Sequence, residues 1–259
     1  MLSESAVALI RDVFSRPQLF RNAHRIRRRE VAWRSGEPPA VFEHSAVVVS
    51  EEQLLAELPK PDSVEGDAFY TITATGIPSV RFGFRFAEAT QATPSDPAAC
   101  RIEAFSDGWV FHVPNSMSSE WILTVGGENG FFSAPAIAET LTGRRWLAVG
   151  SAAMAFDPIC GDGTAHAIRE AVLASACVRA IHNGQPEAAV RAHYESRLLL
   201  GFRRHLALAH SFYRSGHGGP WWDAEADATA RGIAWCDEHI ATFGPPRYRL
   251  EGAELICLP

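Results

Sequence analysis

The sequence predicts a mixed α/β protein in which a strand-rich middle is followed by a helical carboxy-terminal region. Three observations support this fold class. Apolar and polar residues alternate in several segments between residues 69 and 125, as they do in half-buried strands. Apolar residues recur every four positions from Val190 to Leu206, as on one face of a helix. Between these regions, residues 146–170 resemble a short buried strand, a glycine loop and the start of a helix.

The first part of the chain predicts two short helices and two strands. Residues 3–14 have the apolar spacing of a helix with a serine cap at its start. Residues 24–34 and 41–49 predict strands separated by a turn. The pattern Ser50-Glu51-Glu52-Gln53 is a capping box, which predicts a second helix as far as Leu58.

The middle of the chain predicts an antiparallel sheet. A Pro, Ala, Thr and Ser loop at 90–99 divides it, and Asp107-Gly108 is typical of a hairpin turn. Because strands follow one another without intervening helices, we expect no βαβ repeat. The predicted strands cover residues 69–74, 80–87, 101–105, 109–113 and 120–125.

The last part predicts one buried strand and three helices. The strand is Trp146–Gly150, and the helices cover about residues 164–181, 187–213 and 223–242. Glycine and proline interrupt the pattern between them, as expected for helix ends.

Composition excludes several classes of protein. The net charge of −6 argues against a general nucleic-acid-binding protein, which usually carries a basic surface. The five cysteines are widely spaced, so we expect neither a disulfide framework nor a metal site, and we expect reduced thiols in the cytoplasm. The uncharged run at 146–156 is too short to cross a bilayer, so no membrane association is expected.

The loop after Gly150 is the strongest candidate for a functional site. Gly161 and Gly163 predict a tight loop, and Thr164 predicts the cap of the next helix. A helix amino terminus behind a glycine loop favours a polar or anionic ligand group. The alternative is a plain strand-loop-helix connection in which the glycines serve only turn geometry.

This stretch closely resembles the second FAD motif of flavin monooxygenases, flavin-dependent halogenases and their relatives. That motif contains Gly-Asp, then small residues, then D-P-x-x-G-x-G at a helix start, and Ser151 stands where the family usually has Asp. The resemblance implies a remnant of a FAD/NAD(P)-binding flavoprotein fold, with FAD as the cofactor. In the family, Gly-Asp meets the ribityl chain and the proline-glycine loop lies against the flavin ring. The cofactor-binding residues that it implies are Gly150, Ser151, Asp157, Pro158, Gly161, Gly163 and Thr164.

A second resemblance lies at residues 107–114, DGWVFHVP. Halogenases carry W-x-W-x-I-P at an equivalent distance before the FAD motif, which implies that Trp109 and Phe111 face the substrate. The alternative is aromatic packing in a half-buried strand. His112 is the one candidate for acid-base catalysis, because a histidine can exchange a proton near neutral pH.

A third resemblance lies in the tail, HYESRLLLGFRRHLALAHSFYRSGHGGPWW. It is similar to the helical region of flavin monooxygenases that hydroxylate tryptophan in a partner polypeptide during maturation of peptide-derived quinone cofactors. Residues 44–58 also fit that group. The resemblance implies an aromatic substrate, either a small molecule or a polypeptide with tryptophan as the target.

The sequence also departs from this family. The family begins with G-x-G-x-x-G, which occurs nowhere here, so we expect a truncated chain that binds FAD weakly or has lost it. Apolar surface left by a truncation predicts a homo-oligomer or a second subunit. The halogenase lysine has no counterpart, since Lys60 lies in a proline-flanked linker, and halogenation is disfavoured.

These observations predict four segments. Residues 1–68 hold remnants of FAD-domain and substrate-domain elements, 69–145 an antiparallel substrate domain, 146–185 the FAD-motif strand-loop-helix, and 186–259 the helical region. The predicted function is that of an FAD-dependent, monooxygenase-like oxidoreductase. The alternatives are a truncated non-catalytic homologue that binds a partner, or a gene fragment, and a halogenase-like enzyme.

Overall fold

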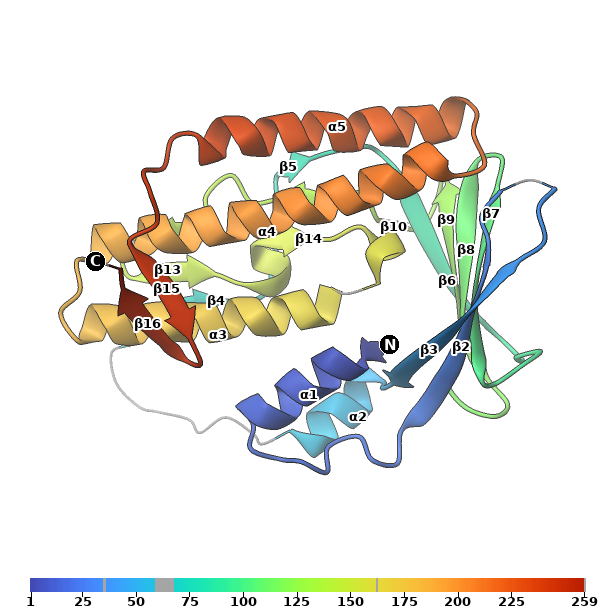
Figure 1. The fold of residues 1–259 in the computed structure, drawn as a ribbon, viewed down its shortest axis with the longest axis horizontal. Helices are drawn as coiled ribbons and strands as arrows, with labels where there is room; N and C mark the ends of the chain where they lie inside the picture. The colour runs from blue at the N-terminus through green and yellow to red at the C-terminus, as the bar shows by residue number, and fades with distance from the viewer. Residues whose placement is uncertain (35, 59–67, 162, 259) are drawn as a thin grey trace. The chain divides into compact units, whose positions relative to one another are not determined.

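The computed structural model describes residues 1–34, 36–58, 68–161 and 163–258. The chain forms two compact units, each built from several segments. Unit 1 contains residues 1–65, 84–133 and 212–225, and unit 2 contains residues 66–83, 134–211 and 226–259. Figure 1 shows the large sheet of unit 1 and the long helices of unit 2.

Unit 1 is built on an eight-stranded sheet. Neighbouring strands pair antiparallel except β2 and β7, whose Arg28 and Ala99 pair in a parallel register. In spatial order the strands are β1 (Leu2–Ser3), β3 (Ala40–Val48), β2 (His24–Ala32), β7 (Ala99–Phe105), β8 (Gly108–Pro114), β9 (Glu120–Gly127), β6 (Phe86–Ala92) and β10 (Phe131–Phe132).

Two short helices of unit 1 begin at the serine caps that the sequence predicts. The Ser3 hydroxyl accepts a hydrogen bond from the amide of Ala6 at the start of α1 (Glu4–Val13). Ser50 and Gln53 form both hydrogen bonds of a capping box at the start of α2 (Glu51–Glu57). Figure 1 shows the two helices side by side near the amino terminus.

The hairpin between β7 and β8 is confirmed, with its turn one residue earlier than the sequence predicts. Phe105 pairs with Gly108, so Ser106 and Asp107 form the two-residue turn. Gly108 is already the first residue of β8. Buried and less buried side chains then alternate along β8. Trp109, Phe111 and Val113 are buried.

We expect Gly108→Ala to lower the free energy of unfolding by about 2 kcal/mol, because overfilled sites cost free energy. A β-carbon at this position would overlap the carbonyl oxygen of Val125, which is backbone and cannot rotate away. Gly127→Ala is the matched control in the same sheet, since its nearest non-neighbouring atom is 3.9 Å from the added carbon. Urea denaturation of both variants measures the difference. Equal stabilities would show that the sheet yields locally at Gly108.

Unit 2 contains α3 (Gly163–His182) and most of α4 (Glu187–Ser215) and α5 (Pro220–Ile240). The chain reverses direction between successive helices (Figure 1). Two three-stranded sheets and a hairpin accompany them. The first sheet is β14 (Met154–Ala155), β11 (Ala136–Ile137) and β5 (Val80–Arg81), the second is β12 (Thr142–Gly143), β13 (Trp146–Ala148) and β4 (Thr71–Thr73), and the hairpin is β15 (Tyr248–Glu251) with β16 (Glu254–Cys257).

The apolar stripe predicted for residues 187–213 forms the centre of the unit 2 core. All five residues of the stripe are buried, and they belong to one cluster with α3 and β13. The stripe residues are Val190, Tyr194, Leu198, Phe202 and Leu206. The phenol of Tyr194 donates a hydrogen bond of 2.6 Å to the carbonyl oxygen of Ala148, which joins α4 to β13.

The mixed α/β fold with a helical carboxy-terminal region is confirmed, but the predicted membership of the sheet was wrong in two respects. Residues 24–48 supply two strands of the eight-stranded sheet, which was expected to begin at residue 69. Residues 71–73 lie outside that sheet and pair in parallel with 146–148 in unit 2. The physical reason is that strand partners are chosen by non-local packing, which alternation within one strand does not encode.

The predicted single strand at 80–87 was also wrong. It divides into β5, in a small sheet of unit 2, and β6, in the large sheet of unit 1. Gly83 separates them with φ of 110°, a conformation that interrupts an extended strand. The break coincides with the boundary between the compact units, because one segment of unit 2 ends at Gly83 and one segment of unit 1 begins at Phe84.

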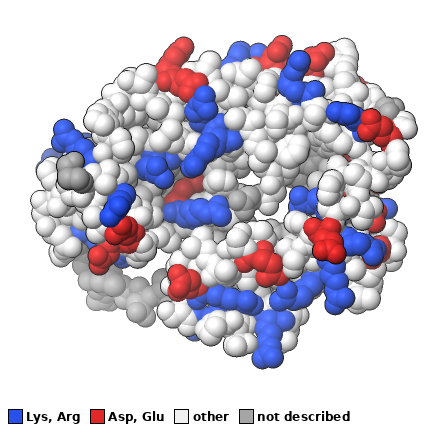
Figure 2. Space-filling model, viewed as in Figure 1, with Lys and Arg blue, Asp and Glu red and all other residues white. Residues whose placement is uncertain are grey.

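The surface of the described residues carries mixed charge. Figure 2 shows basic and acidic side chains interspersed over the face that it draws. None of the helices in the described ranges combines the length and the apolar character needed to cross a membrane.

Candidate functional site

The predicted FAD-motif loop lies in unit 2 and contains two short 3₁₀ turns. After β13, the turn η1 (Gly150–Ala152) leads into β14, and η2 (Pro158–Cys160) leads toward α3. The structure thus places all seven predicted cofactor-binding residues between the end of one strand and the first turn of one helix. Asp162 lies outside the described residues.

The first turn of the loop is fastened to the end of β4. The amide of Val149 donates to the carbonyl oxygen of Thr73 at 2.8 Å, which extends the parallel pairing of β13 and β4. The Ser151 hydroxyl and the Ala152 amide then both donate to the carbonyl oxygen of Ala74, at 3.2 and 3.3 Å. Because the Ser151 proton is used within the protein, its oxygen can only accept a hydrogen bond from a ligand.

Gly150 is held from the other side by Glu170 of α3. Its amide donates to Glu170 Oε2 at 2.8 Å, and its φ of 55° lies in the left-handed region that favours glycine. Glu170 is only 6% exposed, and its Oε1 has no partner among the described residues. Burial raises the pKa of this carboxyl to about 7, and the Gly150 hydrogen bond opposes that rise. The carboxyl that fixes Gly150 is therefore partly protonated near neutral pH.

Asp157 organises the second turn from within. Its carboxylate accepts a hydrogen bond of 3.0 Å from the amide of Ile159, with Pro158 in the first position of the turn. Its own amide donates to Nε2 of His205 on α4 at 2.6 Å, so that ring nitrogen carries no proton. Both Asp157 and His205 are buried. Asp157 thus shapes the loop rather than reaching out from it.

An aromatic cluster supports the same turn. Phe156 stacks on the ring of His166 from α3, with centroids 4.4 Å apart. On its other side, Phe156 meets His205 edge to face at 4.7 Å. The loop is therefore held between two helices by ring packing as well as by hydrogen bonds.

The two glycines at the end of the loop are exposed and have open space above them. Gly161 adopts φ of 65°, a left-handed conformation that a side chain would strain. Gly163 has no such requirement, and a β-carbon on either glycine would meet no atom within 4 Å. A side chain at either position would therefore not clash with the loop itself. The absence of a side chain at Gly163 is thus not required by the fold of the protein.

The predicted role of Thr164 as a helix cap was also wrong. Helix α3 begins at Gly163, so Thr164 lies inside its first turn. Its amide is one of the first donors of a 20-residue helix, which have no acceptor within the helix. Those amides, with the positive end of the helix dipole, can bind a polar or anionic group.

This donor set fits part of the predicted cofactor. The exposed glycines leave room for a flat ring, and the amides at the start of α3 offer hydrogen-bond donors. Ser151 offers an acceptor, which suits a hydroxyl of a ribityl chain. These contacts define Gly161, Gly163, Thr164 and Ser151 as the residues that would face a flavin.

The predicted substrate-facing residues lie in unit 1, on β8. Trp109 is 0% exposed, and its indole nitrogen has no hydrogen-bond partner among the described residues. Phe111 is also buried, two positions along the same face of the strand. Burial gives no support to a substrate-facing role for Trp109, because a fully covered ring cannot touch a ligand.

His112 points to the opposite face of β8 from these aromatic rings. Its Nδ1 lies 3.4 Å from Oε1 of Glu120, a buried carboxylate on the neighbouring strand β9. This pair joins an imidazole to a carboxylate, the arrangement that orients histidines in many sites. A catalytic role for His112 stays a prediction.

The sequence motif does not include two residues that support the site, Glu170 and His205. Glu170 is a single acid in the otherwise small and apolar face of α3, which is the one signal that could have marked it as buried. His205 lies in a helix with several histidines and arginines, where nothing local distinguishes it. Among the described residues, no three His, Cys, Asp or Glu side chains gather as a metal site requires.

Comparison with known proteins connects this fold to flavoenzymes. No protein-family model matches the chain, and no curated protein sequence matches it. One similar solved structure is QhpG, a peptidyl tryptophan dihydroxylase essential for tryptophylquinone cofactor biogenesis. Its TM-score to this chain is 0.70 at 16% sequence identity, and the match covers 99% of this chain and 77% of the QhpG chain. The flavin-dependent halogenase CmlS has a TM-score of 0.64 at 16% identity and covers 92% of this chain.

A third structure, the "probable FAD-dependent monooxygenase" PqsL from Pseudomonas aeruginosa, has a TM-score of 0.61 at 11% identity. It covers 92% of this chain and 88% of its own. The chain spans 62% of the length of CmlS. At these identities the likeness shows a shared fold. The predicted resemblance to flavin-dependent halogenases and FAD-dependent monooxygenases is confirmed at that level.

Proposed function

We propose that this chain is part of a flavin-dependent oxidoreductase of the monooxygenase kind. The observation that carries the proposal is the exposed pair Gly161 and Gly163, with open space above them, directly before the amino terminus of α3. This loop occurs in a fold shared with FAD-dependent enzymes. When bound, the flavin would supply the redox chemistry, because protein side chains do not transfer electrons to oxygen by themselves.

Different residues of the loop would contact different parts of the flavin. Gly161 and Gly163 let a flat ring approach the backbone closely, and the first amides of α3 donate to its polar edge. Ser151 accepts a hydrogen bond from a ribityl hydroxyl, in place of the aspartate that usually stands there. Glu170 and Asp157 keep the two turns in place from behind, and neither carboxylate needs to touch the cofactor.

An aromatic substrate, with tryptophan in a polypeptide as the specific case, is the substrate class that we propose. The support is the fit of 99% of this chain to QhpG, which is described as a peptidyl tryptophan dihydroxylase. Halogenation has the same support from the fold, but Lys60, the single lysine of the chain, lies outside the described residues. The alternative of a non-catalytic homologue predicts no saturable flavin binding.

We expect Gly163→Leu to weaken flavin binding at least about tenfold, corresponding to 1.4 kcal/mol or more, without loss of stability. The leucine side chain meets no protein atom close to its β-carbon, so only a ligand over the loop would collide with it. FAD and FMN are each titrated with the protein, and binding is measured from the quenching of flavin fluorescence. A parallel thermal melt reports stability.

Gly201→Leu is the matched control, because Gly201 lies in α4 with equally open space around its β-carbon. It should leave flavin affinity unchanged. Equal affinity of wild type and Gly163→Leu would move the flavin away from this loop. Failure of wild type to bind either flavin would favour the non-catalytic alternative.

A further inference from the structure

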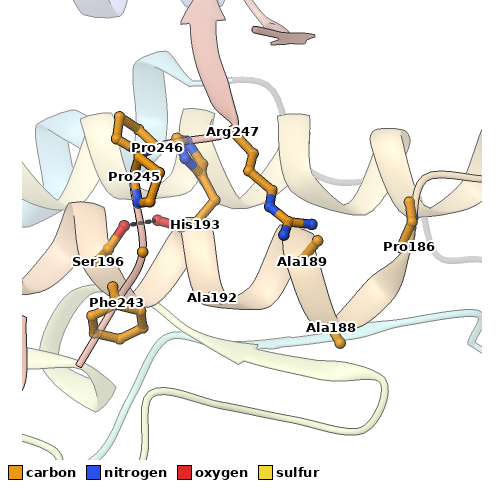
Figure 3. A pocket seen from close by; sticks show the side chains of 11 residues that line it. Pro186, Ala188, Ala189, Ala192, His193, Ser196, Phe243, Pro245, Pro246 and Arg247 are labelled. Atoms are coloured by element: carbon orange, nitrogen blue, oxygen red, sulfur yellow. Dashed lines mark hydrogen bonds between the residues drawn. The ribbon is translucent and has the colours of Figure 1, made fainter. Parts of the chain in front are cut away.

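A second cavity in unit 2 lies between the first turns of α4 and the segment that follows α5. Its volume is about 500 Å³, within the range of small-molecule sites. None of the residues assigned to the flavin loop lines it. The lining residues that Figure 3 labels are Pro186, Ala188, Ala189, Ala192, His193, Ser196, Phe243, Pro245, Pro246 and Arg247.

His193 is the buried polar group of this cavity, and it lacks a hydrogen-bond partner among the described residues. It is 6% exposed, and neither ring nitrogen has a hydrogen-bond partner among the described residues. Its ring meets Tyr248 edge to face at 5.7 Å, which fixes its orientation without satisfying a nitrogen. Burial, and then the charge of Arg197, lowers the pKa of His193 to about 4, so the ring is neutral at pH 7. A neutral buried imidazole needs a hydrogen-bond acceptor for its N–H and a donor for its other nitrogen. Because His193 lines the cavity, a bound ligand can supply these partners.

The walls beside His193 are apolar. Three alanines of α4 form one wall, and Phe243 with two prolines forms another. The Ser196 hydroxyl turns back to donate to the carbonyl oxygen of His193 at 2.8 Å, so it adds little polarity (Figure 3). Such walls favour a planar apolar body over a sugar or a peptide backbone, whose polar groups would lack partners.

The mouth of the cavity is positively charged. Figure 3 shows the Arg247 guanidinium reaching along α4 toward Ala189. Arg247 is exposed, and its side chain has no ion pair or hydrogen bond among the described residues. The start of α4 adds the positive end of a 29-residue helix.

The acid at that helix start is already engaged elsewhere. Glu187 Oε1 accepts hydrogen bonds from the Arg145 amide at 3.1 Å and the Tyr70 hydroxyl at 3.4 Å. It therefore does not neutralise Arg247. A negative group on a ligand is what this mouth would attract.

We propose that this cavity binds a small aromatic carboxylate. The ring lies between the alanine wall and Phe243, the carboxylate pairs with Arg247, and a ring heteroatom or hydroxyl hydrogen-bonds to His193. This site is separate from the flavin loop and does not depend on the function proposed for it.

Three probes of nearly equal shape test each part of this proposal. Nicotinate carries both the ring nitrogen and the carboxylate, benzoate lacks the nitrogen, and nicotinamide lacks the charge. We expect nicotinate to bind the full chain with a Kd on the order of 1 mM or below, and nicotinamide about tenfold more weakly. Benzoate should fall between them. The readout is the ring-proton NMR signal of His193, assigned by its loss in His193→Phe.

The variants separate the contacts. Arg247→Gln should bind nicotinate no better than nicotinamide, whereas Arg249→Gln, an exposed arginine paired with Glu251, should bind it normally. His193→Phe should bind nicotinate and benzoate equally, as followed by calorimetry. Ala192→Leu narrows the cavity at the alanine wall and keeps both polar groups, so it should weaken nicotinate binding even if His193→Phe fails to fold.

Gly163→Leu, which obstructs the flavin loop, should leave nicotinate binding unchanged. Three results would overturn the proposal. The first is that the His193 ring-proton signals do not move at nicotinate concentrations about tenfold above the expected Kd. The second is that Arg247→Gln binds nicotinate as tightly as wild type does. The third is that Gly163→Leu no longer binds nicotinate. The first of these would mean that only water satisfies the His193 ring.

Discussion

Replacing Glu225 with glutamine should lower the free energy of unfolding by about 3–5 kcal/mol, because it removes the charge of a carboxylate that pairs with a buried guanidinium. Glu225 forms an ion pair with Arg85 inside unit 1, where the two residues are 6% and 2% exposed. Arg85 also donates to the carbonyl oxygen of Ser133 at 3.2 Å, and its guanidinium lies 5.3 Å from the ring centroid of Tyr213. These contacts hold Arg85 in place, so it cannot reach water when the carboxylate is gone. Urea denaturation followed by tryptophan fluorescence measures the loss.

Two further variants show whether charge is the cause. Glu251→Gln removes the carboxylate of an exposed pair with Arg249 and should change stability little, as surface pairs usually contribute little. Replacing both partners, Arg85→Met with Glu225→Leu, should recover most of the stability lost in Glu225→Gln. If Glu225→Gln unfolds at the same urea concentration as wild type, the pair is not shielded from water as its burial implies.

Elements whose signals are local could be predicted closely. The capping box of Ser50 and Gln53 needs only four consecutive residues, and both of its hydrogen bonds are present. The stripe on α4 needs only the period of a helix, and every predicted stripe residue is buried. Helix α5 begins at Pro220, three residues before its predicted start at residue 223. Proline suits the first position of a helix, so this boundary was ambiguous from sequence.

Pairing between distant segments could not be predicted. Residues 28–32 pair in parallel with 99–103 across a long stretch of chain, and 71–73 pair in parallel with 146–148. Each strand shows its alternation, but its partner depends on packing that forms only in the complete fold. The division of 80–87 has the same origin, since both halves look alike as sequence.

The turns of the candidate site could be predicted from the sequence, but the residues on neighbouring helices that hold these turns in place could not. Asp157, Pro158 and Gly161 have the residue types that a capped turn and a left-handed residue require, and the structure places them in those roles. Glu170 and His205 reach the loop from two helices, so their roles depend on how those helices pack. Of these two supports, Glu170 is the one whose raised pKa makes the loop sensitive to pH.

Glu170 should make the stability of the chain fall as pH rises from about 4.5 to 7. The pKa of this carboxyl is about 7 in the folded protein, against an ordinary value of 4.5. Between these values the folded chain keeps a proton that the unfolded chain has released, so rising pH favours unfolding. The stabilisation is complete below pH 4.5 and is lost as pH passes 7, a change on the order of 3 kcal/mol.

Glu170→Gln isolates this contribution, because glutamine keeps the shape and does not titrate. The comparison is needed because His193 acts in the opposite direction. Its pKa is lowered to about 4, so its contribution to stability rises with pH through the same range and masks the fall in wild type alone. The unfolding free energy of Glu170→Gln minus that of wild type should therefore increase from pH 4.5 to 8, because only wild type loses the contribution of Glu170. A difference that stays constant over this range would show that Glu170 is ionised behind Gly150, with a pKa close to its ordinary value.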